Sequence, residues 1–481
     1  MEPASSQALG IAHVVANILH RQVEHFQQVN GHTAFRLSQF ALVNKLWADE
    51  ATEMIWAHLD ELAPLERVKP ERRQYYAAKI RSLKVVLDPR SPPATACLSG
   101  LALPRLREVE LMFYYDATLQ HIPPVLTSEV RAVTVHFSPR CLARACDYAF
   151  EAMMTRCHHL ETLKYIGPSR HLDPVKLLSL MSSQRQTLLD VRIHMADSLS
   201  QHSLTEDITT HLAERSMVRR LYAPKSELHA PRIQVPFEHL EMLETRIDYR
   251  SLYTISGSLP GLKTLRINLL RCEDLPSEPL DPILSRLANS TQLEILKIDR
   301  RPRPREGTSG VQTPVTLSGP AFASFAQACR NMKELSLSIQ PGMVAQDFTV
   351  VHLERAALCF PQLREVALFL TPEASSVAAA AVSIFGRNCP ELESCHILGE
   401  VTVLDIDWET ETVFPNLRRL SLNQIRGQET NWSLDTYDSK LRKKFPRLEL
   451  LQVMKSFPGP LSAGASYLYD VPRAPRSDPC A

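Results

Sequence analysis

The stretch LKTLRI at residues 262–267 decides the fold of this chain, because its apolar spacing recurs along most of the sequence. Aliphatic residues occupy its first, fourth and sixth positions. Alternation over the last three positions is typical of a β-strand with one buried face. A chain that repeats one strand-sized unit builds a stacked surface, and such surfaces hold other proteins far more often than they perform chemistry.

The pattern occurs fourteen times, with aliphatic substitutions and one loose copy. Individual spacings run from 22 to 39 residues, and thirteen steps cover the 368 residues from Ile80 to Leu448, a mean of about 28. This mean lies within the roughly 20–29-residue period of leucine-rich repeats. The copies begin at Ile80, Leu106, Val130, Leu160, Leu188, Val218, Leu240, Leu262, Leu293, Met332, Leu363, Leu392, Leu417 and Leu448.

The residues between the copies indicate short amphipathic helices. Apolar residues recur three and four apart in 322–329 and 350–360, which is the helical period. Asp173-Pro174 and Asp281-Pro282 each place a carboxylate where it can cap a helix before a proline suited to the first turn. One helix and one strand per repeat are therefore predicted.

Cysteine stands near the end of several of these predicted helices, shortly before the strand pattern. The four cases are Cys157, Cys329, Cys359 and Cys389. In this feature the chain resembles the cysteine-containing type of leucine-rich-repeat protein. The resemblance implies an α/β leucine-rich-repeat solenoid, an arc or horseshoe, of about 14 repeats over 80–455, and the variable spacing predicts an irregular arc.

Composition narrows the classes of function. Lys+Arg 54 against Asp+Glu 53 gives no electrostatic reason to expect nucleic acid or an anionic membrane as a partner. The start lacks the basic and apolar regions of a signal peptide, and no apolar run approaches the length of a spanning helix. We therefore expect an intracellular protein, cytoplasmic or nuclear.

Neither an enzyme nor a metal site is expected from the motifs. The 10 cysteines have no Cys-x-x-Cys spacing, and burial as thiols explains them better than disulfides. The sequence has no phosphate-binding glycine-rich loop, no His-Glu-x-x-His and no Gly-x-Ser-x-Gly. We predict no catalytic residue, no metal and no cofactor.

The first 60 residues do not follow the repeat. Residues 8–23 and 41–56 each place apolar residues on one broad helical face. This pattern predicts a small all-α unit in 1–60, joined by a connecting helix in 61–79 to the repeats. Such a unit can serve simply as a cap that shields the first repeat.

The wording of 41–56 adds a second interpretation. A leucine-valine pair, Leu42-Val43, is followed by Trp47 and, nine residues on, Trp56, and residues 11–19 supply an upstream aliphatic helix. The segment resembles an F-box. The resemblance implies binding to the Skp-type adaptor of an SCF ubiquitin ligase, and through it to a cullin, with Trp56 anchoring the motif to the next part of the chain. The adaptor-binding candidates carried over from the motif are Leu9, Ile11, Val14, Ile18, Leu42, Val43 and Trp47.

In F-box proteins a following repeat domain selects the substrate, so the resemblance implies a substrate receptor. The residues that alternate with the buried aliphatics of each strand should line the concave face. They mix both signs of charge, so neither an acidic nor a basic ligand is predicted. The substrate-binding candidates are Glu110, Lys164, Arg192, Arg266, Lys297, Phe369 and Arg419.

Two segments fit neither part. The longest spacing contains an Arg/Pro run at 300–305 that predicts an inserted loop. Residues 456–481 are proline-rich and lack periodicity, which predicts a disordered tail. The runner-up for the whole chain is a leucine-rich-repeat scaffold that binds a partner but no ligase, with the N-terminal helices as its cap.

Overall fold

The structure is a computed structural model of the 481-residue chain, and it divides into two compact units, residues 1–200 (unit 1) and 201–481 (unit 2). The residues that it describes are 13–21, 42–87, 94–115, 125–196, 202–214, 216–230, 235–270, 278–300, 315–339, 342–371, 375–398, 414–423, 444–454 and 466–470.

Unit 1 begins with helices and continues as a parallel strand ladder. Residues 13–21 are helical, and α3 (Lys45–Ala57) runs into the short strand β1 (His58–Leu59). The predicted connecting helix at 61–79 is instead two helices, α4 (Ala63–Arg67) and α5 (Pro70–Ala77). Pro70 explains the break, because proline disfavours the helical conformation of the residue before it and suits the first turn of a new helix.

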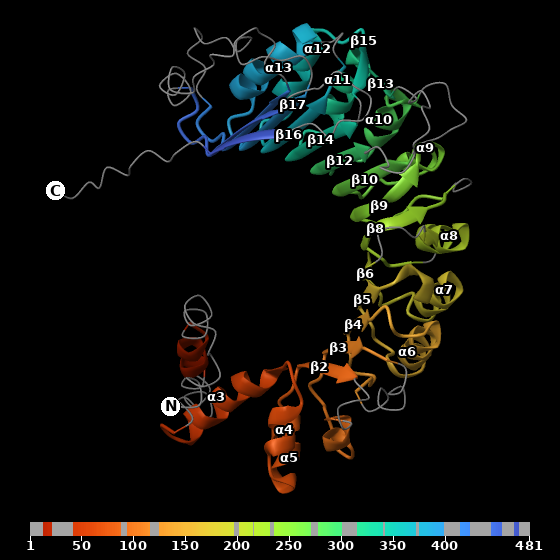
Figure 1. Cartoon of the computed structure of the whole chain (residues 1–481), viewed down its shortest axis with the longest axis vertical. Helices are drawn as coiled ribbons and strands as arrows, with labels where there is room; N and C mark the ends of the chain where they lie inside the picture. The colour runs from red at the N-terminus through yellow and green to blue at the C-terminus, as the bar shows by residue number, and fades with distance from the viewer. Residues whose placement is uncertain are drawn as a thin grey trace, which may run out of the picture. The chain divides into compact units, whose positions relative to one another are not determined.

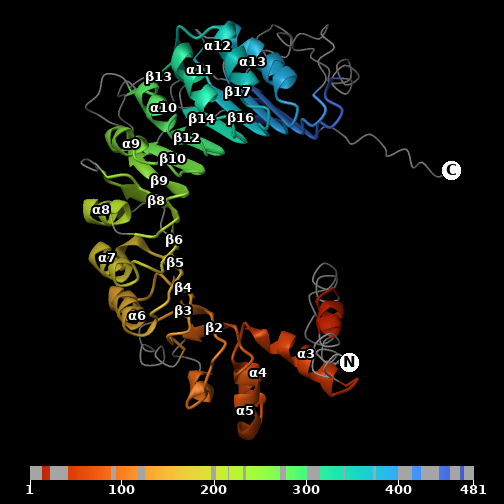
Figure 2. The same ribbon diagram turned by 180° about the vertical axis from the view of Figure 1, so that it is seen from behind.

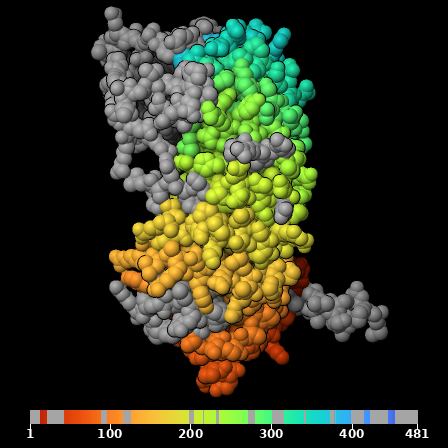
Figure 3. Space-filling view, turned by 90° about the vertical axis from the view of Figure 1, so that its right-hand side faces the viewer, coloured from red at the N-terminus to blue at the C-terminus, as the bar shows by residue number. Residues whose placement is uncertain are grey.

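In unit 1 each strand from β1 to β6 pairs in parallel with the next, and one register runs through the whole ladder (Figure 1). The helices α6 (Ala143–Arg156) and α7 (Pro174–Ser183) lie on one side of it, the side that faces the viewer in Figure 3. Asp173 caps α7 by accepting from the Val175 amide at 2.9 Å, as predicted. The remaining strands are β2 (Ser82–Leu87), β3 (Glu108–Phe113), β4 (Ala132–Phe137), β5 (Thr162–Gly167) and β6 (Asp190–Met195), and a 3-10 turn η1 (Ala94–Leu98) comes after β2.

Unit 2 repeats the arrangement with helices on one side of its parallel ladder (Figures 1 and 2). Its strands are β7 (His202–Leu204), β8 (Arg220–Leu228), β9 (Met242–Asp248), β10 (Thr264–Leu270), β12 (Ile295–Arg300), β14 (Glu334–Ile339), β16 (Glu365–Phe369), β17 (Ser394–Leu398), β18 (Arg419–Asn423) and β19 (Leu450–Met454). Its helices are α8 (Glu206–Glu214), α9 (Tyr249–Ser256), α10 (Asp281–Leu287), α11 (Gly319–Ala328), α12 (Val350–Leu358) and α13 (Ser375–Asn388).

Two features of unit 2 differ from the sequence-based expectation. β11 (Glu278–Pro279), β13 (Val315–Ser318) and β15 (Met343–Gln346) form a second, three-stranded parallel sheet, and each of them follows a ladder strand in the chain and precedes a helix. Asp281 does not cap α10 but lies in its first turn, where its carboxylate accepts from the Ser318 amide at 2.8 Å. The carboxylate therefore joins α10 to the strand that precedes α11.

Within the tail for which disorder is predicted, Ser466–Asp470 form β20, which pairs antiparallel with β19. Tyrosine favours strands, and an added strand covers the unpaired backbone groups that an edge strand presents. The rest of 456–481 and the loop at 301–305 lie outside the described residues.

Each of the fourteen copies of the sequence pattern coincides with a ladder strand. Alternate residues of these strands are buried toward the helices, as in the pattern iBiBiB of β4, so their neighbours form the opposite side, here called the open face. Cysteine occupies the predicted helix-to-strand junction, where Cys157 and Cys329 are the C-caps of α6 and α11 and burial raises both pKa values to about 12. The fold is α/β and has the repeat architecture of a leucine-rich-repeat solenoid.

Candidate protein-binding surfaces

The N-terminal helices have a buried side and an exposed side. Val15, Leu19 and Ala51 form a small core between the helix at 13–21 and α3. Leu46, Trp47, Met54 and Ile55 are partly buried against it. Trp47, one of the adaptor-binding candidates, therefore contributes to the packing of the helices themselves.

Four other adaptor-binding candidates are exposed although they are large and apolar. The exposed fraction is 55% for Val14, 41% for Ile18, 87% for Leu42 and 59% for Val43. Val14 and Ile18 are four residues apart, as are the buried Val15 and Leu19, so the helix at 13–21 presents an apolar row on each of two sides. Leu9 and Ile11 lie outside the described residues.

The start of α3 explains why Leu42 and Val43 are exposed. Asn44 is the N-cap, and its side-chain oxygen accepts from the Trp47 amide at 3.1 Å. A capping residue keeps a non-helical backbone and marks the start of the helix, so Leu42 and Val43 precede the helical face that packs on the core. The Leu42-Val43 pair is thereby held outside the core.

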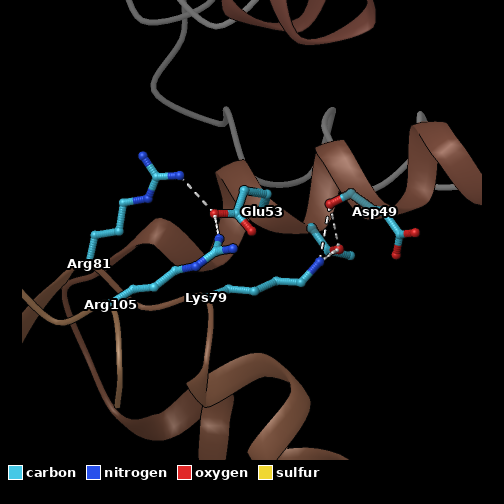
Figure 4. Close-up of polar contacts among 6 residues, drawn as sticks. Asp49, Glu53, Lys79, Arg81 and Arg105 are labelled. Atoms are coloured by element: carbon cyan, nitrogen blue, oxygen red, sulfur yellow. Dashed lines mark hydrogen bonds and ion pairs between the residues drawn. The ribbon is translucent and has the colours of Figure 1, made fainter. Parts of the chain in front are cut away.

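Several polar contacts attach α3 to the first repeats of unit 1 (Figure 4). The Glu53 carboxylate accepts from Arg81 at 2.8 Å and from Arg105 at 2.5 Å. The Lys79 ammonium donates to the Thr52 hydroxyl at 2.7 Å and to the Asp49 carbonyl at 3.1 Å. These residues come from α3, from the chain just before β2 and from the chain before β3.

Aromatic and backbone contacts complete this attachment. Trp56 stacks on Tyr76 of α5 with 4.6 Å between ring centroids, which agrees with the anchoring role predicted for it. The Arg81 amide donates to the Ala57 carbonyl at 2.8 Å, and β1 then pairs with β2. The helix that follows the exposed Leu42-Val43 pair is thus continuous with the strand ladder.

The open face collects the substrate-binding candidates. Glu110, Lys164 and Arg192 share one register row of unit 1, in which Thr134 lies between the first two. Arg266 and Lys297 share the corresponding row of unit 2. The row of Lys297 continues through Ser336 to Ala367 of β16, and Phe369 lies two residues after Ala367. Arg419 is the first residue of β18. The alternation therefore places every one of these side chains on the open face of its own unit.

Charged side chains on the open face of unit 2 pair with one another. The Lys297 ammonium lies 2.9 Å from Glu334 and 2.8 Å from Glu365, and Arg266 lies 3.7 Å from both Glu244 and Glu334. Burial lowers the pKa of Lys297, but hydrogen bonds from its ammonium to Glu365 and Glu334 outweigh burial, and its pKa is raised overall. Burial raises the pKa of Glu244.

Beside this network the open face of unit 2 has a shallow cavity of about 270 Å³. The small residues Ser336, Ser338 and Ala367 leave this space, and Phe369 and His396 border it. His396 is held at both ring nitrogens, with Ser394 at 2.8 Å and Ser421 at 2.7 Å, and burial lowers its pKa. No carboxylate holds this imidazole as the third group of a catalytic triad would, among the hydrogen bonds of the described residues.

Histidines of the open face were missed by the sequence-based choice of candidates. His136, His194 and His396 alternate with buried aliphatics in the same way as the predicted residues. The period-two pattern was therefore a sufficient signal for all three. The partners of Glu53, by contrast, lie 28 and 52 residues away, and no local pattern marks them.

In the part of the chain that the structure describes, no group of three or more His, Cys, Asp or Glu side chains could hold a metal ion. The eight described cysteines are free thiols. None of the helices there is long and apolar enough to cross a membrane.

No protein-family model matches the chain, and no curated protein matches it. Among solved structures, the crystal structure of the Rad7 and Elc1 complex in yeast aligns with 96% of this chain and 97% of its own chain, at 13% sequence identity and a TM-score of 0.38. A TM-score below 0.5 does not establish a common fold. The repeat architecture therefore rests on the strand register and burial of this chain.

Proposed function

We propose that this chain is a non-catalytic substrate receptor of an SCF-type ubiquitin ligase. The N-terminal helices would dock on the Skp-type adaptor, and through it on a cullin, while the open face of the repeats holds a protein substrate. The mechanism is proximity, because a target held near a ubiquitin-loaded enzyme presents its lysines at high effective concentration without a catalytic residue in the receptor.

The exposure of Val14, Ile18, Leu42 and Val43 is the observation that carries this proposal. These are the residues that the F-box resemblance assigns to the adaptor, and they are exposed while their sequence neighbours form the core. Apolar side chains that enter a groove on a partner each contribute roughly 1.5–3 kcal/mol when fully buried.

The attachment of α3 to the ladder supports the same proposal. A receptor must hold its substrate at a defined distance from the ligase, and a flexible joint would weaken that geometry. The ion pairs of Glu53, the Lys79 contacts and the Trp56–Tyr76 stack fix α3 to the first repeats. The position of the helices therefore sets the position of the first strands.

Co-purification of the full chain with a Skp-type adaptor tests the proposal. The Leu42→Ala, Val43→Ala double variant should lose at least about 100-fold in affinity, since two buried anchors together account for roughly 3 kcal/mol. Val350→Ala with Val351→Ala is the matched control, because these two valines are 42% and 55% exposed on α12 of unit 2.

Circular dichroism should show the same strand and helix content in both variants. Undiminished capture by the Leu42/Val43 variant would refute the assignment of the docking residues. Failure of the wild-type chain to capture the adaptor would favour the scaffold alternative.

One observation favours that alternative, in which the helices are a cap. The strand β1 comes directly after α3 and pairs with β2, so the helical segment covers an edge of the first repeat. A cap of this kind would need the buried Val15, Leu19 and Ala51 but would gain nothing from an exposed Leu42. The double variant therefore separates the two functions.

A further inference from the structure

Basic and histidine side chains gather on the open face of β4, β5 and β6 in unit 1. Lys164 of β5 lies in register between Thr134 of β4 and Arg192 of β6. Two residues further along, His136 and His194 flank Ile166 in the same manner. Because side chains alternate along a strand, all of these residues point to one side of the sheet.

Lys164 is the cation of this group that no carboxylate neutralises among the described residues. Arg192 is held by its own strand, where its guanidinium contacts the Asp190 carboxylate at 2.8 to 3.2 Å. Glu110 of β3 is already contacted by Lys84 at 3.3 Å and by His136 at 3.4 Å. The group therefore has one surplus positive charge, at Lys164.

The charge of Lys164 affects the pKa values of His136 and His194. Burial lowers the pKa of His136, Lys164 and Lys84 lower it further, and Glu110 opposes them. Burial also lowers the pKa of His194, with Lys164, Arg192 and His136 acting in the same direction. Both imidazoles therefore favour the neutral form, and a carboxylate bound beside Lys164 would favour the protonated form of each.

We propose that the open face of β4 to β6 binds an acidic, extended segment of the protein substrate, with one Asp or Glu carboxylate paired to Lys164 between His136 and His194. This inference rests on the proposed function, because it assigns a chemical class to the substrate that the repeats would hold. Lys164 and Arg192 lie on neighbouring strands, so an extended peptide crossing the strands would meet both in succession.

A carboxylate fits this site better than a phosphate group. Phosphate recognition typically uses the fork of an unoccupied arginine, whereas Arg192 is occupied by Asp190. A doubly charged phosphate would also approach the two carboxylates of Asp190 and Glu110. One negative charge matches the single surplus cation at Lys164.

Fluorescence anisotropy of the full chain with a labelled peptide of alternating Glu and Ser tests the inference. Lys164→Glu should weaken binding by at least about tenfold, because it replaces attraction with repulsion. Lys176→Glu is the matched control, since Lys176 belongs to α7 on the helix-bearing side of the same unit, and it should bind as the wild type does.

Two further peptides and one double variant complete the design. A Lys/Ser peptide should not bind, and a phosphoserine/Ser peptide should bind more weakly than the Glu/Ser peptide. Lowering the pH from 7.5 to 6.0 should strengthen binding of the Glu/Ser peptide several-fold, because the bound carboxylate favours the charged imidazoles. The double variant His136→Gln, His194→Gln should lose that gain.

Equal binding of the Glu/Ser peptide by wild type and Lys164→Glu, or no binding up to millimolar peptide, would overturn the inference. Binding of the phosphoserine peptide alone would replace the carboxylate by a phosphate ligand and overturn it as well. Adaptor capture is measured on the same variants. Lys164→Glu should capture the adaptor normally and the Leu42/Val43 variant should bind the peptide normally, so the failure of one proposal is distinguished from the failure of the other.

Discussion

Lys164 in unit 1 and Lys297 in unit 2 occupy the same position of the repeat, between two buried apolar residues of a strand on the open face. Lys297 is held between Glu334 and Glu365, at 2.9 and 2.8 Å. Lys164 has no such carboxylate among the described residues, and its register neighbours are Thr134 and Arg192. The position is therefore equivalent in geometry, but the neighbouring strands decide whether the charge stabilises the fold or is available to a ligand.

The largest expected difference between the two lysines concerns stability. Lys297→Glu would bring three carboxylates together on a half-buried surface, and we expect it to cost about 2–3 kcal/mol of unfolding free energy. Lys164→Glu should cost less than about 0.5 kcal/mol, since it breaks no pair. Urea unfolding of both variants measures the contrast, and equal losses would show that the two positions do not differ in this way.

A smaller effect is expected at alkaline pH. The pKa of Lys297 is raised in the folded protein above its ordinary value of 10.5, since its two glutamate hydrogen bonds outweigh burial. The resulting stabilisation is complete below pH 10.5 and is lost as the pH rises through the folded pKa. The difference in unfolding free energy between wild type and Lys297→Met should therefore shrink above pH 10.5. Lys164→Met is the matched control for the removal of one lysine.

The smallest effect concerns the histidines of the two open faces. Burial lowers the pKa of His136, His194 and His396 below the ordinary value of 6.5. The neutral imidazoles therefore contribute stability that is present above pH 6.5 and is lost as the pH falls through their folded pKa values.

Addition of the Glu/Ser peptide should raise the pKa of His136 and His194 and leave that of His396 unchanged, because both ring nitrogens of His396 are held by serines. Nuclear magnetic resonance with ¹³C-labelled histidine follows all three. A matching shift at His396 would mean that the peptide does not distinguish the two faces.

Much of the fold could be predicted because its signal is local. A ladder strand can be recognised from alternating aliphatic residues alone. The ends of two helices can be recognised from Cys157 and Cys329, which stand shortly before the next strand pattern. The three-stranded sheet of β11, β13 and β15 was not predicted, because strands of two to four residues are too short to show a periodic pattern of apolar residues. The two helices in place of one at 61–79 could have been read from Pro70.

The candidate surfaces were predictable in part for the same reason. The Leu42-Val43 pair and the buried positions of the repeats can be recognised from patterns that span only a few residues. Trp47 could not be assigned in this way, because whether it faces a partner or the core depends on the helix at 13–21 packing against α3. Neither could the attachment of α3, since Glu53 meets Arg105, which is 52 residues away.

The sequence by itself determined the repeat, the side of each strand that is buried and the residues of the open face, because the two-residue period of a strand is a property of the backbone. Only the tertiary structure decided which charges become neighbours. Successive copies of the strand pattern are 22 to 39 residues apart, and the register of the strands places Lys164 beside Arg192. Lys297 lies beside Ser336 in register, and its ammonium reaches Glu365 on β16, two strands away. That register turns one repeated lysine position into an internal ion pair in unit 2 and into a proposed contact for an acidic substrate in unit 1.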